Sequence, residues 1–313
     1  MKILVTTHPF GDPNPTPRRQ LDGRDVIYNP EGRKLKKGEL KRILIQCQPD
    51  IIIAGTEEYA EWTLDLVSNL AMISRVGIGI DGIDLKVCEE RGIVVTNTPD
   101  APSNAVAELT ICQMLNMLRR VQEADRAMRE GNWYRHIGRD IRSCDIGVIG
   151  CGRIGRLVLE KVAGLKPRRI FANDIIPERC RGIERTEPES KLQIFASCDI
   201  ITIHIPFEER NLHYVGPREF NLMKPDACLI NMSRGAIVDE GALYDWLEVG
   251  DGSAAIDVFT KEPYSGPLVK LDNAYLTPHL GSCTRKSRFD MEVGAVEEVL
   301  NLLEHKEFNN RVV

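Results

Sequence analysis

Residues 144–174 read CDIGVIGCGRIGRLVLEKVAGLKPRRIFAND, and this stretch decides the fold. The apolar run at 144–149 predicts a buried parallel strand, which leads directly into the glycine pattern GxGxxG at 150–155. Apolar residues then recur at helical spacing from Ile154 to Val162, so the glycine turn opens an amphipathic helix. A second strand at 169–173 ends in Asp174. This order of strand, turn, helix, strand and acidic residue is typical of a dinucleotide-binding unit.

Each part of this stretch has a physical role in binding a dinucleotide. Gly150 permits a tight turn, Gly152 lets the backbone approach a pyrophosphate, and Gly155 lets the helix pack closely on the strand. The N–H groups at the start of the helix can hold phosphate. Asp174 would accept the ribose hydroxyls and repel the additional phosphate of NADP. The stretch therefore predicts NAD as the cofactor.

The composition is that of a globular protein. The 313 residues are 42% hydrophobic and 28% charged, which allows two domains with substantial cores. A net charge of −5, with acids and bases mixed along the chain, gives no surface for nucleic acid or an anionic membrane. Nine cysteines are scattered without CxxC pairs or zinc spacing, which predicts reduced thiols, a cytoplasmic protein and no metal site. Because residues 1–5 enter a strand at once, we expect no signal peptide, and no apolar run is long enough to span a bilayer.

Short β-branched runs alternate with helix-length segments along the chain. The strands expected outside the opening stretch are 3–6, 26–28, 51–54, 72–75, 93–96, 199–203, 228–231, 253–257 and 274–277. Crossover helices are expected at 60–70 and 85–91. The alternation predicts the α/β class, with two doubly wound parallel-sheet (Rossmann-like) domains and the active-site cleft between them.

Prolines at 99 and 102 mark a hinge between the domains. We expect a flavodoxin-like substrate-binding domain at 1–98 with 287–313, and an NAD-binding Rossmann domain at 99–286. Helical spacing after Ser103, an N-cap residue, predicts one long helix over 105–128 that crosses between the domains and contributes to a dimer interface. A last helix over 286–305 is expected to return to the first domain.

Chemically useful side chains follow the expected strands, where ligands bind in open parallel sheets. His279 can take or give a proton near neutral pH. Glu262 could hydrogen-bond its imidazole and stabilise the protonated form. Arg234 offers a planar fork that matches a carboxylate. This set predicts a hydride-transfer site for a 2-hydroxy or 2-keto acid.

Sequence blocks over nearly the whole chain resemble one enzyme family. They are RVGIGID (75–81), NTP (97–99), AELT (107–110), GNW (131–133), GCGRIG (150–155), SRG (233–235), VDE (238–240), DVF (257–259), EP (262–263) and TPHLG (277–281). On these blocks the chain is identified as a member of the D-isomer-specific 2-hydroxyacid dehydrogenase family. It is most similar to the 3-phosphoglycerate dehydrogenase branch.

The resemblance implies roles for individual residues. Arg234 would bind and polarise the substrate, His279 would be the acid/base, Glu262 its partner, and Asp257 would hold the nicotinamide carboxamide. The implied cofactor residues are Gly150, Gly152, Arg153, Ile154, Gly155, Asp174, His204, Pro206, Met232, Asp257 and Gly281. The implied substrate-binding residues are Arg75, Val76, Gly77, Ile78, Gly79, Arg135, Arg234 and His279.

Within the substrate set, the resemblance implies that the loop from Arg75 to Gly79 meets the carboxylate through backbone N–H groups. Arg75 and Arg135 would bind a substrate phosphate, with Arg135 acting across a homodimer interface. The resemblance implies the oxidation of D-3-phosphoglycerate to 3-phosphohydroxypyruvate, the first step of serine biosynthesis. A glyoxylate or hydroxypyruvate reductase is the alternative, because the same set serves both reactions. A non-catalytic NAD-sensing scaffold is the alternative from another class.

The chain departs from the family pattern at several positions. Cys151 replaces a larger apolar residue in the glycine turn, and 166–168 (KPR) is an unusual entry to the second strand. Gly82 replaces the Asn that often follows the aspartate of the substrate loop, which leaves the shape of that loop open. Because the chain ends with the catalytic core, we expect no feedback regulation by serine.

Overall fold

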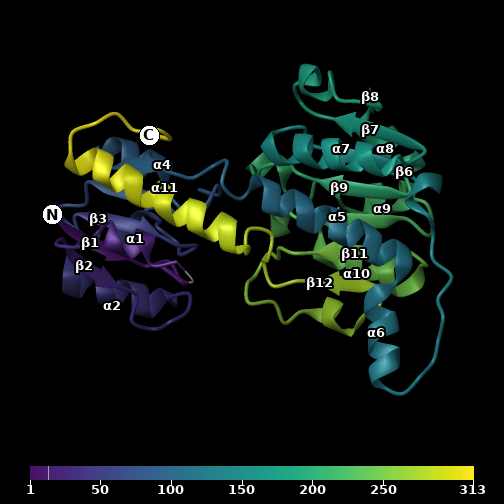
Figure 1. Cartoon of the computed structure of the whole chain (residues 1–313), viewed down its shortest axis with the longest axis horizontal. Coiled ribbons are helices and arrows are strands. Elements are labelled where there is room, and N and C mark those ends of the chain that lie inside the picture. The colour runs from purple at the N-terminus through teal and green to yellow at the C-terminus, as the bar shows by residue number, and fades with distance from the viewer. Residues whose placement is uncertain (13) are drawn as a thin grey trace. The chain divides into compact units, whose positions relative to one another are not determined.

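The computed structural model describes residues 1–12 and 14–313 of the chain (Figure 1). The chain divides into two compact units. Unit 1 comprises Met1–Pro102 and Ser282–Val313, and unit 2 comprises Ser103–Gly281. Each unit contains one parallel sheet with helices, which confirms the predicted α/β class. Over the described ranges, no helix combines the length and apolar character needed to cross a membrane.

Unit 1 is built on a five-stranded parallel sheet in the order β2-β1-β3-β4-β5. Its strands are β1 (Lys2–Val5), β2 (Asp25–Tyr28), β3 (Ile51–Ala54), β4 (Met72–Arg75) and β5 (Val94–Thr96). Its helices are α1 (Thr16–Arg19), α2 (Lys37–Cys47), α3 (Glu61–Leu64), α4 (Leu85–Glu90) and α11 (Arg285–Leu303). Apolar residues of β3 alternate between two buried cores, with Ile52 in one and Ile51 and Ile53 in the other. Burial on both faces explains why every position of this strand is apolar.

Unit 2 is built on a seven-stranded parallel sheet in the order β12-β11-β10-β9-β6-β7-β8. Its strands are β6 (Asp145–Ile149), β7 (Arg169–Asn173), β8 (Thr186–Pro188), β9 (Ile200–Ile203), β10 (Cys228–Asn231), β11 (Ser253–Ile256) and β12 (Ala274–Leu276). Its α-helices are α5 (Ser103–Arg119), α6 (Val121–Arg129), α7 (Arg153–Leu165), α8 (Lys191–Ser197), α9 (Pro217–Leu222) and α10 (Glu240–Val249). Its 3₁₀ turns are η1 (Ile141–Ser143), η2 (Pro177–Cys180), η3 (Glu209–Asn211), η4 (Gly235–Ile237) and η5 (Pro267–Lys270). Apolar side chains of α5 and α7 fill one core, and those of α8, α9 and α10 fill another.

Strand β8 was not among the six strands that the sequence predicts for this sheet. It pairs with β7 at one edge, and none of its three residues is buried. The segment TEP contains a proline and no apolar run, so its local pattern indicates a loop. Pairing with β7 makes it a strand.

Two helix predictions were wrong in extent. The single helix expected over 105–128 is two helices, because Arg120 adopts a left-handed conformation with φ 51°. The N–H of Arg139 donates to the carbonyl of Leu118 at 2.9 Å, which ends α5 by occupying an acceptor of its last turn. In place of a helix over 60–70, α3 stops at Leu64, and the side chain of Gln48 bonds to the backbone of the residues that follow. Both breaks come from segments distant in sequence.

The order of strands in unit 2 reverses at β6. Strands β7 and β8 lie on one side of β6, and β9 to β12 lie on the other. Loops that leave β6 and β9 therefore separate in opposite directions at the carboxyl edge of the sheet. Such a switch point is where open parallel sheets bind ligands.

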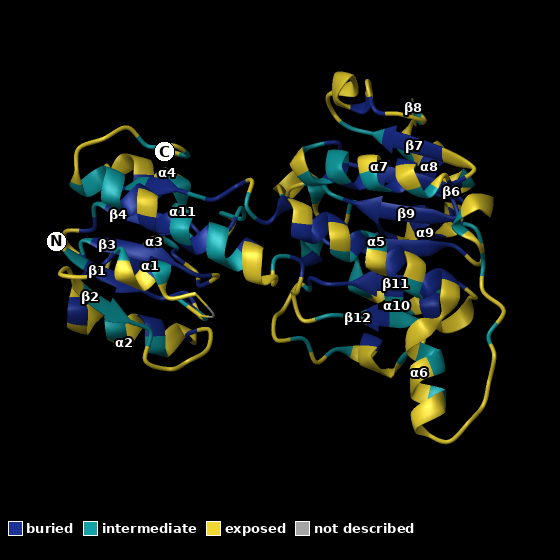
Figure 2. Cartoon of the chain, viewed as in Figure 1, coloured by how far each residue is buried: buried dark blue, intermediate teal, exposed yellow. Residues whose placement is uncertain are grey.

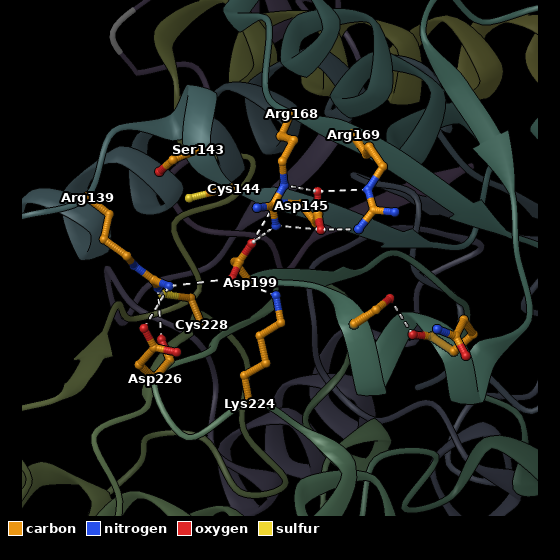
Figure 3. A network of polar contacts seen from close by, with 12 residues as sticks. Arg139, Ser143, Cys144, Asp145, Arg168, Arg169, Asp199, Lys224, Asp226 and Cys228 are labelled. Atoms are coloured by element: carbon orange, nitrogen blue, oxygen red, sulfur yellow. Dashed lines mark hydrogen bonds and ion pairs between the residues drawn. The ribbon is translucent and has the colours of Figure 1, made fainter.

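The opposite, amino-terminal edge of the same sheet carries a network of charged residues (Figure 3). Asp145, the fully buried first residue of β6, accepts four hydrogen bonds of 2.5–3.1 Å from Arg168 and Arg169. Asp199 accepts from the N–H of Asp145 at 2.6 Å and from Lys224 at 2.8 Å. Burial by itself would raise the pKa of the Asp145 carboxyl, but the two arginines outweigh it and hold that pKa well below the usual range. The unusual KPR entry to β7 thus supplies an arginine that joins β6 to β7.

Helix α6 is the least buried helix of unit 2, and Figure 2 shows it mainly in the colour of exposed residues. None of its residues is buried. The segment that follows it is also exposed and carries large apolar side chains among polar ones, with Trp133 at 80% and Ile137 at 100% exposure. Exposed apolar side chains in neighbouring segments are typical of a protein–protein contact surface.

Candidate active site

The glycine turn after β6 is shaped by close packing. Gly150 has φ 91°, in the left-handed region, and a Cβ atom on it would lie 2.4 Å from the carbonyl oxygen of His204. A Cβ on Gly155 would lie 1.8 Å from the carbonyl oxygen of Gly150. Gly152 caps α7, and no atom of the described residues lies within 4 Å of its Cβ position. Two glycines are therefore required for packing, while the third faces space in which a phosphate can approach the start of α7.

Asp174 lies directly after β7, and its side chain is only 6% exposed. One carboxylate oxygen accepts from the N–H of Cys151 at 2.7 Å, and the other accepts from the N–H of Ile176 at 2.8 Å. The carboxylate is therefore fixed beside the glycine turn. This is the position that the sequence predicts for the acceptor of the ribose hydroxyls.

His204 follows β9 and faces the glycine turn across the switch point. Its Nε2 atom lies 2.9 Å from the hydroxyl of Thr202, while Nδ1 is buried with no hydrogen-bond partner within the described part of the chain. Burial lowers the pKa of His204 to about 3, so the ring is neutral. A buried polar atom without a partner is one that a bound group can satisfy. Together with the open side of Gly152 and the fixed carboxylate of Asp174, this nitrogen fits a dinucleotide at this edge.

The remaining predicted cofactor residues lie at the same carboxyl edge of the sheet or in α7. Arg153 opens α7 and Ile154 follows it. Pro206 lies beyond β9, where its carbonyl accepts from Asn211 at 2.9 Å. Met232 is buried directly after β10.

His279 and Glu262 form a contact pair in unit 2. The Nδ1 atom of His279 lies 3.1 Å from both carboxylate oxygens of Glu262. The side chains are 42% and 31% exposed, so they remain accessible to a small molecule. Glu262 is held in turn by the N–H of Phe259, which donates to it at 3.2 Å. The geometry directs the opposite ring nitrogen, Nε2, away from the carboxylate.

Asp257 holds the turn that carries His279. One oxygen of its buried carboxylate accepts from the hydroxyl of Thr277 at 2.6 Å and from the N–H of Leu280 at 2.7 Å. The other accepts from the N–H of Gly281 at 2.8 Å. Burial raises the pKa of Asp257, and these bonds partly oppose the rise. Sequence reasoning missed both this positioning role and Thr277, although a threonine before Pro-His was visible in the sequence.

Arg234 is positioned by a residue that sequence reasoning also missed. Asn231, the fully buried last residue of β10, donates to the carbonyl of Arg234 at 2.9 Å. Its side-chain oxygen accepts from the N–H of Ser233 at 3.0 Å and from the Ser233 hydroxyl at 2.7 Å. The available signal was a polar residue that ends the apolar strand CLIN. A Cβ on Gly235 would lie 2.0 Å from the backbone of Phe259, so this turn packs against the segment that leads to Glu262.

The loop after β4 in unit 1 is held by its own arginine. The guanidinium of Arg75 donates to the carbonyl of Gly79 at 3.0 Å and also to that of Val76. Gly77 has φ 133°, and its N–H donates to the hydroxyl of Thr98 at 2.8 Å. The side chain of Arg75 therefore braces the backbone of the predicted substrate loop.

Packing explains Gly82, the departure beside this loop. A Cβ atom at this position would lie 3.0 Å from the carbonyl oxygen of Glu57. The carbonyl of Gly82 also accepts from the N–H of Tyr59 at 2.6 Å. An asparagine here would require the backbone at Glu57 to shift, so the glycine matches the course of that segment.

The structure does not bring Arg135 to the other site residues of unit 2. It lies in the exposed segment between α6 and η1. Arg139 in the same segment bonds to Asp226, which precedes β10, so the segment returns to the amino-terminal edge of the sheet. The predicted catalytic and cofactor residues of unit 2 lie at the carboxyl edge or in the loops beyond it.

Comparisons with known proteins agree with this arrangement. The model of the D-isomer specific 2-hydroxyacid dehydrogenase, NAD binding domain, matches residues 111–281, which confirms NAD as the cofactor. The D-3-phosphoglycerate dehydrogenase of Archaeoglobus fulgidus is 34% identical over 287 residues, which are 89% of this chain and 54% of that protein. The glyoxylate reductase of Thermococcus litoralis is 34% identical over 255 residues, which are 77% of this chain and 76% of that protein.

A solved structure extends the likeness to the whole chain. The crystal structure of a protein from Thermus thermophilus covers 100% of both chains with a TM-score of 0.89 and 30% sequence identity. The chain spans about half the length of the curated phosphoglycerate dehydrogenases that it matches. By family model, sequence and fold, the chain belongs to the D-isomer-specific 2-hydroxyacid dehydrogenase family.

Proposed function

We propose that the chain is an NAD-dependent oxidoreductase that moves a hydride between C2 of a D-2-hydroxy acid and the nicotinamide. The observation that carries this proposal is the His279–Glu262 pair, with its 3.1 Å contacts, in the unit that also holds the glycine turn. Family membership supports it. The reaction that we propose is the oxidation of D-3-phosphoglycerate to 3-phosphohydroxypyruvate, the first step of serine biosynthesis.

The proton is handled by His279. Glu262 occupies Nδ1, so Nε2 is the atom that takes the hydroxyl proton during oxidation and returns it during reduction. The carboxylate beside the ring stabilises the imidazolium that forms. NAD, when bound, supplies the acceptor for the hydride. The protein contributes position and charge rather than redox chemistry.

The substrate's acid group is recognised by planar and backbone donors. Arg234 presents a fork that suits a carboxylate and can polarise the oxygen on C2. For the loop from Arg75 to Gly79, we propose the N–H groups of Ile78 and Gly79 as carboxylate donors. The N–H groups of Val76 and Gly77 already donate to the carbonyl of Ala54 and to Thr98.

The cofactor residues act by fit to NAD. The start of α7 would hold the pyrophosphate, Asp174 the adenine ribose, and His204 Nδ1 another polar group of the dinucleotide. Asp257 fixes the turn of His279 and, as the family resemblance implies, would also hold the carboxamide. Arg153, Ile154, Pro206, Met232 and Gly281 complete the proposed cofactor set.

A homodimer is part of the proposal. Exposed Trp133 and Ile137 flank Arg135, and α6 has no buried residue. A second copy that covers this surface would bury the apolar side chains and carry Arg135 toward a substrate phosphate in its partner, with Arg75 as the second cation. Ile137→Asp should shift the molecular mass in light scattering from dimer to monomer. Val249→Asp, which changes an exposed residue at the end of α10, should leave the dimer intact. A wild-type monomer would overturn this part of the proposal.

A glyoxylate or hydroxypyruvate reductase is the second candidate. The chain covers 76% of the Thermococcus litoralis glyoxylate reductase but only 54% of the Archaeoglobus fulgidus phosphoglycerate dehydrogenase, at the same 34% identity. The same His279, Glu262 and Arg234 serve either reaction, so the distal group of the substrate separates them. A cytoplasmic location is also proposed, because all nine cysteines are free thiols.

To test this proposal, NADH formation is measured at alkaline pH with D-3-phosphoglycerate, D-glycerate and D-lactate. NADP in place of NAD is the control for cofactor preference. A preference for D-3-phosphoglycerate would support the proposed reaction and the roles of Arg75 and Arg135. A preference for D-glycerate, or reduction of small keto acids only, would support the second candidate. Tight NADH binding without turnover of any acid would overturn both and favour a scaffold.

A further inference from the structure

Two buried thiols meet beside the glycine turn. The sulfur atoms of Cys151 and Cys180 lie 3.4 Å apart, and the residues are 0% and 2% exposed. Cys151 stands between the first two glycines of the turn, and Cys180 is the last residue of η2. No role in the proposed reaction uses either sulfur.

The same carboxylate ties together the two segments that carry these thiols. Asp174 accepts from the N–H of Cys151 at 2.7 Å through one oxygen. It accepts from the N–H of Ile176, at the start of the segment that leads into η2, through the other at 2.8 Å. If the two sulfurs move closer together, the surroundings of Asp174 must therefore also change. Asp174 is the residue that we propose as the acceptor of the adenine ribose hydroxyls.

A covalent bond would require movement that the glycine turn cannot absorb. A disulfide has an S–S distance of about 2.0 Å, so sulfurs now 3.4 Å apart must approach by roughly 1.4 Å. The turn is confined, because Cβ atoms on Gly150 and Gly155 would already collide with backbone oxygens. The movement therefore falls on η2 and on Asp174, to which its entry segment is bonded.

We propose that Cys151 and Cys180 form an intramolecular disulfide when the chain meets a small-molecule disulfide such as oxidised glutathione, and that the oxidised chain binds NADH about tenfold more weakly. A tenfold loss corresponds to one weakened hydrogen bond to a charged group, here at Asp174. This proposal goes beyond the proposed reaction and requires only that the chain bind NAD.

The disulfide forms in two steps of thiol–disulfide exchange. The thiolate of Cys180 attacks one sulfur of the small disulfide, which forms a mixed disulfide and releases one small thiol. The thiolate of Cys151 then attacks the sulfur of Cys180 and releases the second small thiol. Two electrons and two protons pass from the protein thiols to the oxidant. Cys180 is the entry point because exposed residues, Arg179 and Arg181, lie on both sides of it, so that a local opening of η2 brings its buried sulfur to solvent.

Burial makes this exchange slow. It raises the pKa of both thiols, so little thiolate is present near neutral pH. The two equilibria are linked. If oxidation weakens NADH binding by a given factor, bound NADH must shift the thiol–disulfide equilibrium toward the reduced form by the same factor. A tenfold preference would raise the reduction potential of the pair by about 30 mV at saturating NADH.

The experiment equilibrates the full chain with a series of glutathione redox buffers, with and without NADH, and alkylates the remaining thiols. Peptide mapping by mass spectrometry identifies the cross-link, and NADH fluorescence gives the dissociation constant of each form. We expect a cross-link between residues 151 and 180, formed less readily with NADH, and a dissociation constant raised about tenfold. Neither measurement depends on catalytic turnover. A negative result for the disulfide can therefore be distinguished from a negative result for the proposed reaction.

Variants separate this pair from the other cysteines. Cys180→Ser and Cys180→Ala should each abolish both the cross-link and the effect of oxidation on NADH binding. Cys112→Ser, which changes an exposed cysteine of α5, should behave as the wild type. The proposal is overturned if both thiols are alkylated throughout the series, if the cross-link joins other cysteines, or if the cross-linked chain binds NADH as tightly as the reduced chain.

Discussion

The Nδ1 atom of His279 is equidistant, at 3.1 Å, from the two carboxylate oxygens of Glu262. His279 itself adopts a left-handed backbone conformation with φ 54°, and its N–H donates to the carbonyl of Asp257 at 2.9 Å. The ring is therefore oriented at both its side chain and its backbone. This orientation commits Nδ1 to the protein, and Nε2 is the atom that we propose for proton transfer.

Glu262→Gln should lower kcat/KM by about a hundredfold, because a neutral amide cannot stabilise the imidazolium that forms when His279 takes a proton. The dissociation constant of NADH should change little, since Glu262 lies outside the glycine turn. Steady-state kinetics and NADH fluorescence give the two values. Glu248→Gln, at an exposed glutamate of α10, is the matched control and should retain full activity. Near-normal turnover of the Glu262 variant would remove Glu262 from the proposed site.

Asn231→Ala should raise KM for the acid substrate about tenfold, because the turn of Arg234 loses the side chain that accepts from the N–H of Ser233 and donates to the carbonyl of Arg234. The matched control is Asn273→Ala. Asn273 bonds to the carbonyls of Leu247 and Gly252 at the amino-terminal edge of the sheet. Both variants should lose about 1–3 kcal/mol of unfolding free energy. Equal KM values for the two variants would show that Asn231 supports the fold and not the site.

Asp174→Asn should raise the preference for NADP over NAD by about tenfold, measured as the ratio of kcat/KM for the two cofactors. The amide oxygen can still accept from the N–H of Cys151, but the amide nitrogen cannot accept from the N–H of Ile176. The substitution therefore removes one backbone hydrogen bond together with the negative charge that repels a ribose phosphate. Glu187→Gln, an exposed acid on β8, should leave the ratio unchanged. An unchanged ratio in the Asp174 variant would mean that another feature excludes NADP.

Asp145→Asn should lower the unfolding free energy by about 2 kcal/mol at neutral pH, because the buried carboxylate accepts charged hydrogen bonds from Arg168 and Arg169. The expected loss is modest because both arginines are half exposed, at 52% and 50%, and solvent screens their charge.

The same variant has a defined pH dependence. The folded pKa of Asp145 lies below its unfolded value of about 3.9, so its stabilisation is present above that pH and is lost as the pH falls toward the folded pKa. The difference between wild type and variant in urea unfolding should therefore shrink at about pH 3. A difference that grows on acidification would contradict this account.

The structure could be predicted from the sequence wherever a local pattern of residues determines it. Buried apolar strands such as 51–54 and 145–149, and the glycine turn that follows the latter, are visible without knowledge of the rest of the chain. The structure also shows His279 beside Glu262, as predicted from their chemistry.

The features that the sequence did not predict depend on contacts between segments that are distant in the sequence. The break of the long helix at Arg120 depends on Arg139, and the short α3 depends on Gln48. Strand β8 exists through its pairing with β7. The positioning roles of Asn231 and Thr277 could not be predicted, because the sequence does not show which turns their side chains reach. A hydroxyl or an amide group can bond to many different partners.

The most direct test of the proposed function uses D-3-phosphoglycerate and D-glycerate that carry deuterium at C2, with mass analysis of the cofactor after turnover. We expect that the deuterium of the D-acid appears on the nicotinamide and that the L-enantiomers give none. We also expect that His279→Asn lowers the rate of transfer by at least about a hundredfold. Reduced cofactor without deuterium, or equal transfer from the L-acids, would contradict hydride transfer from C2 of a D-2-hydroxy acid.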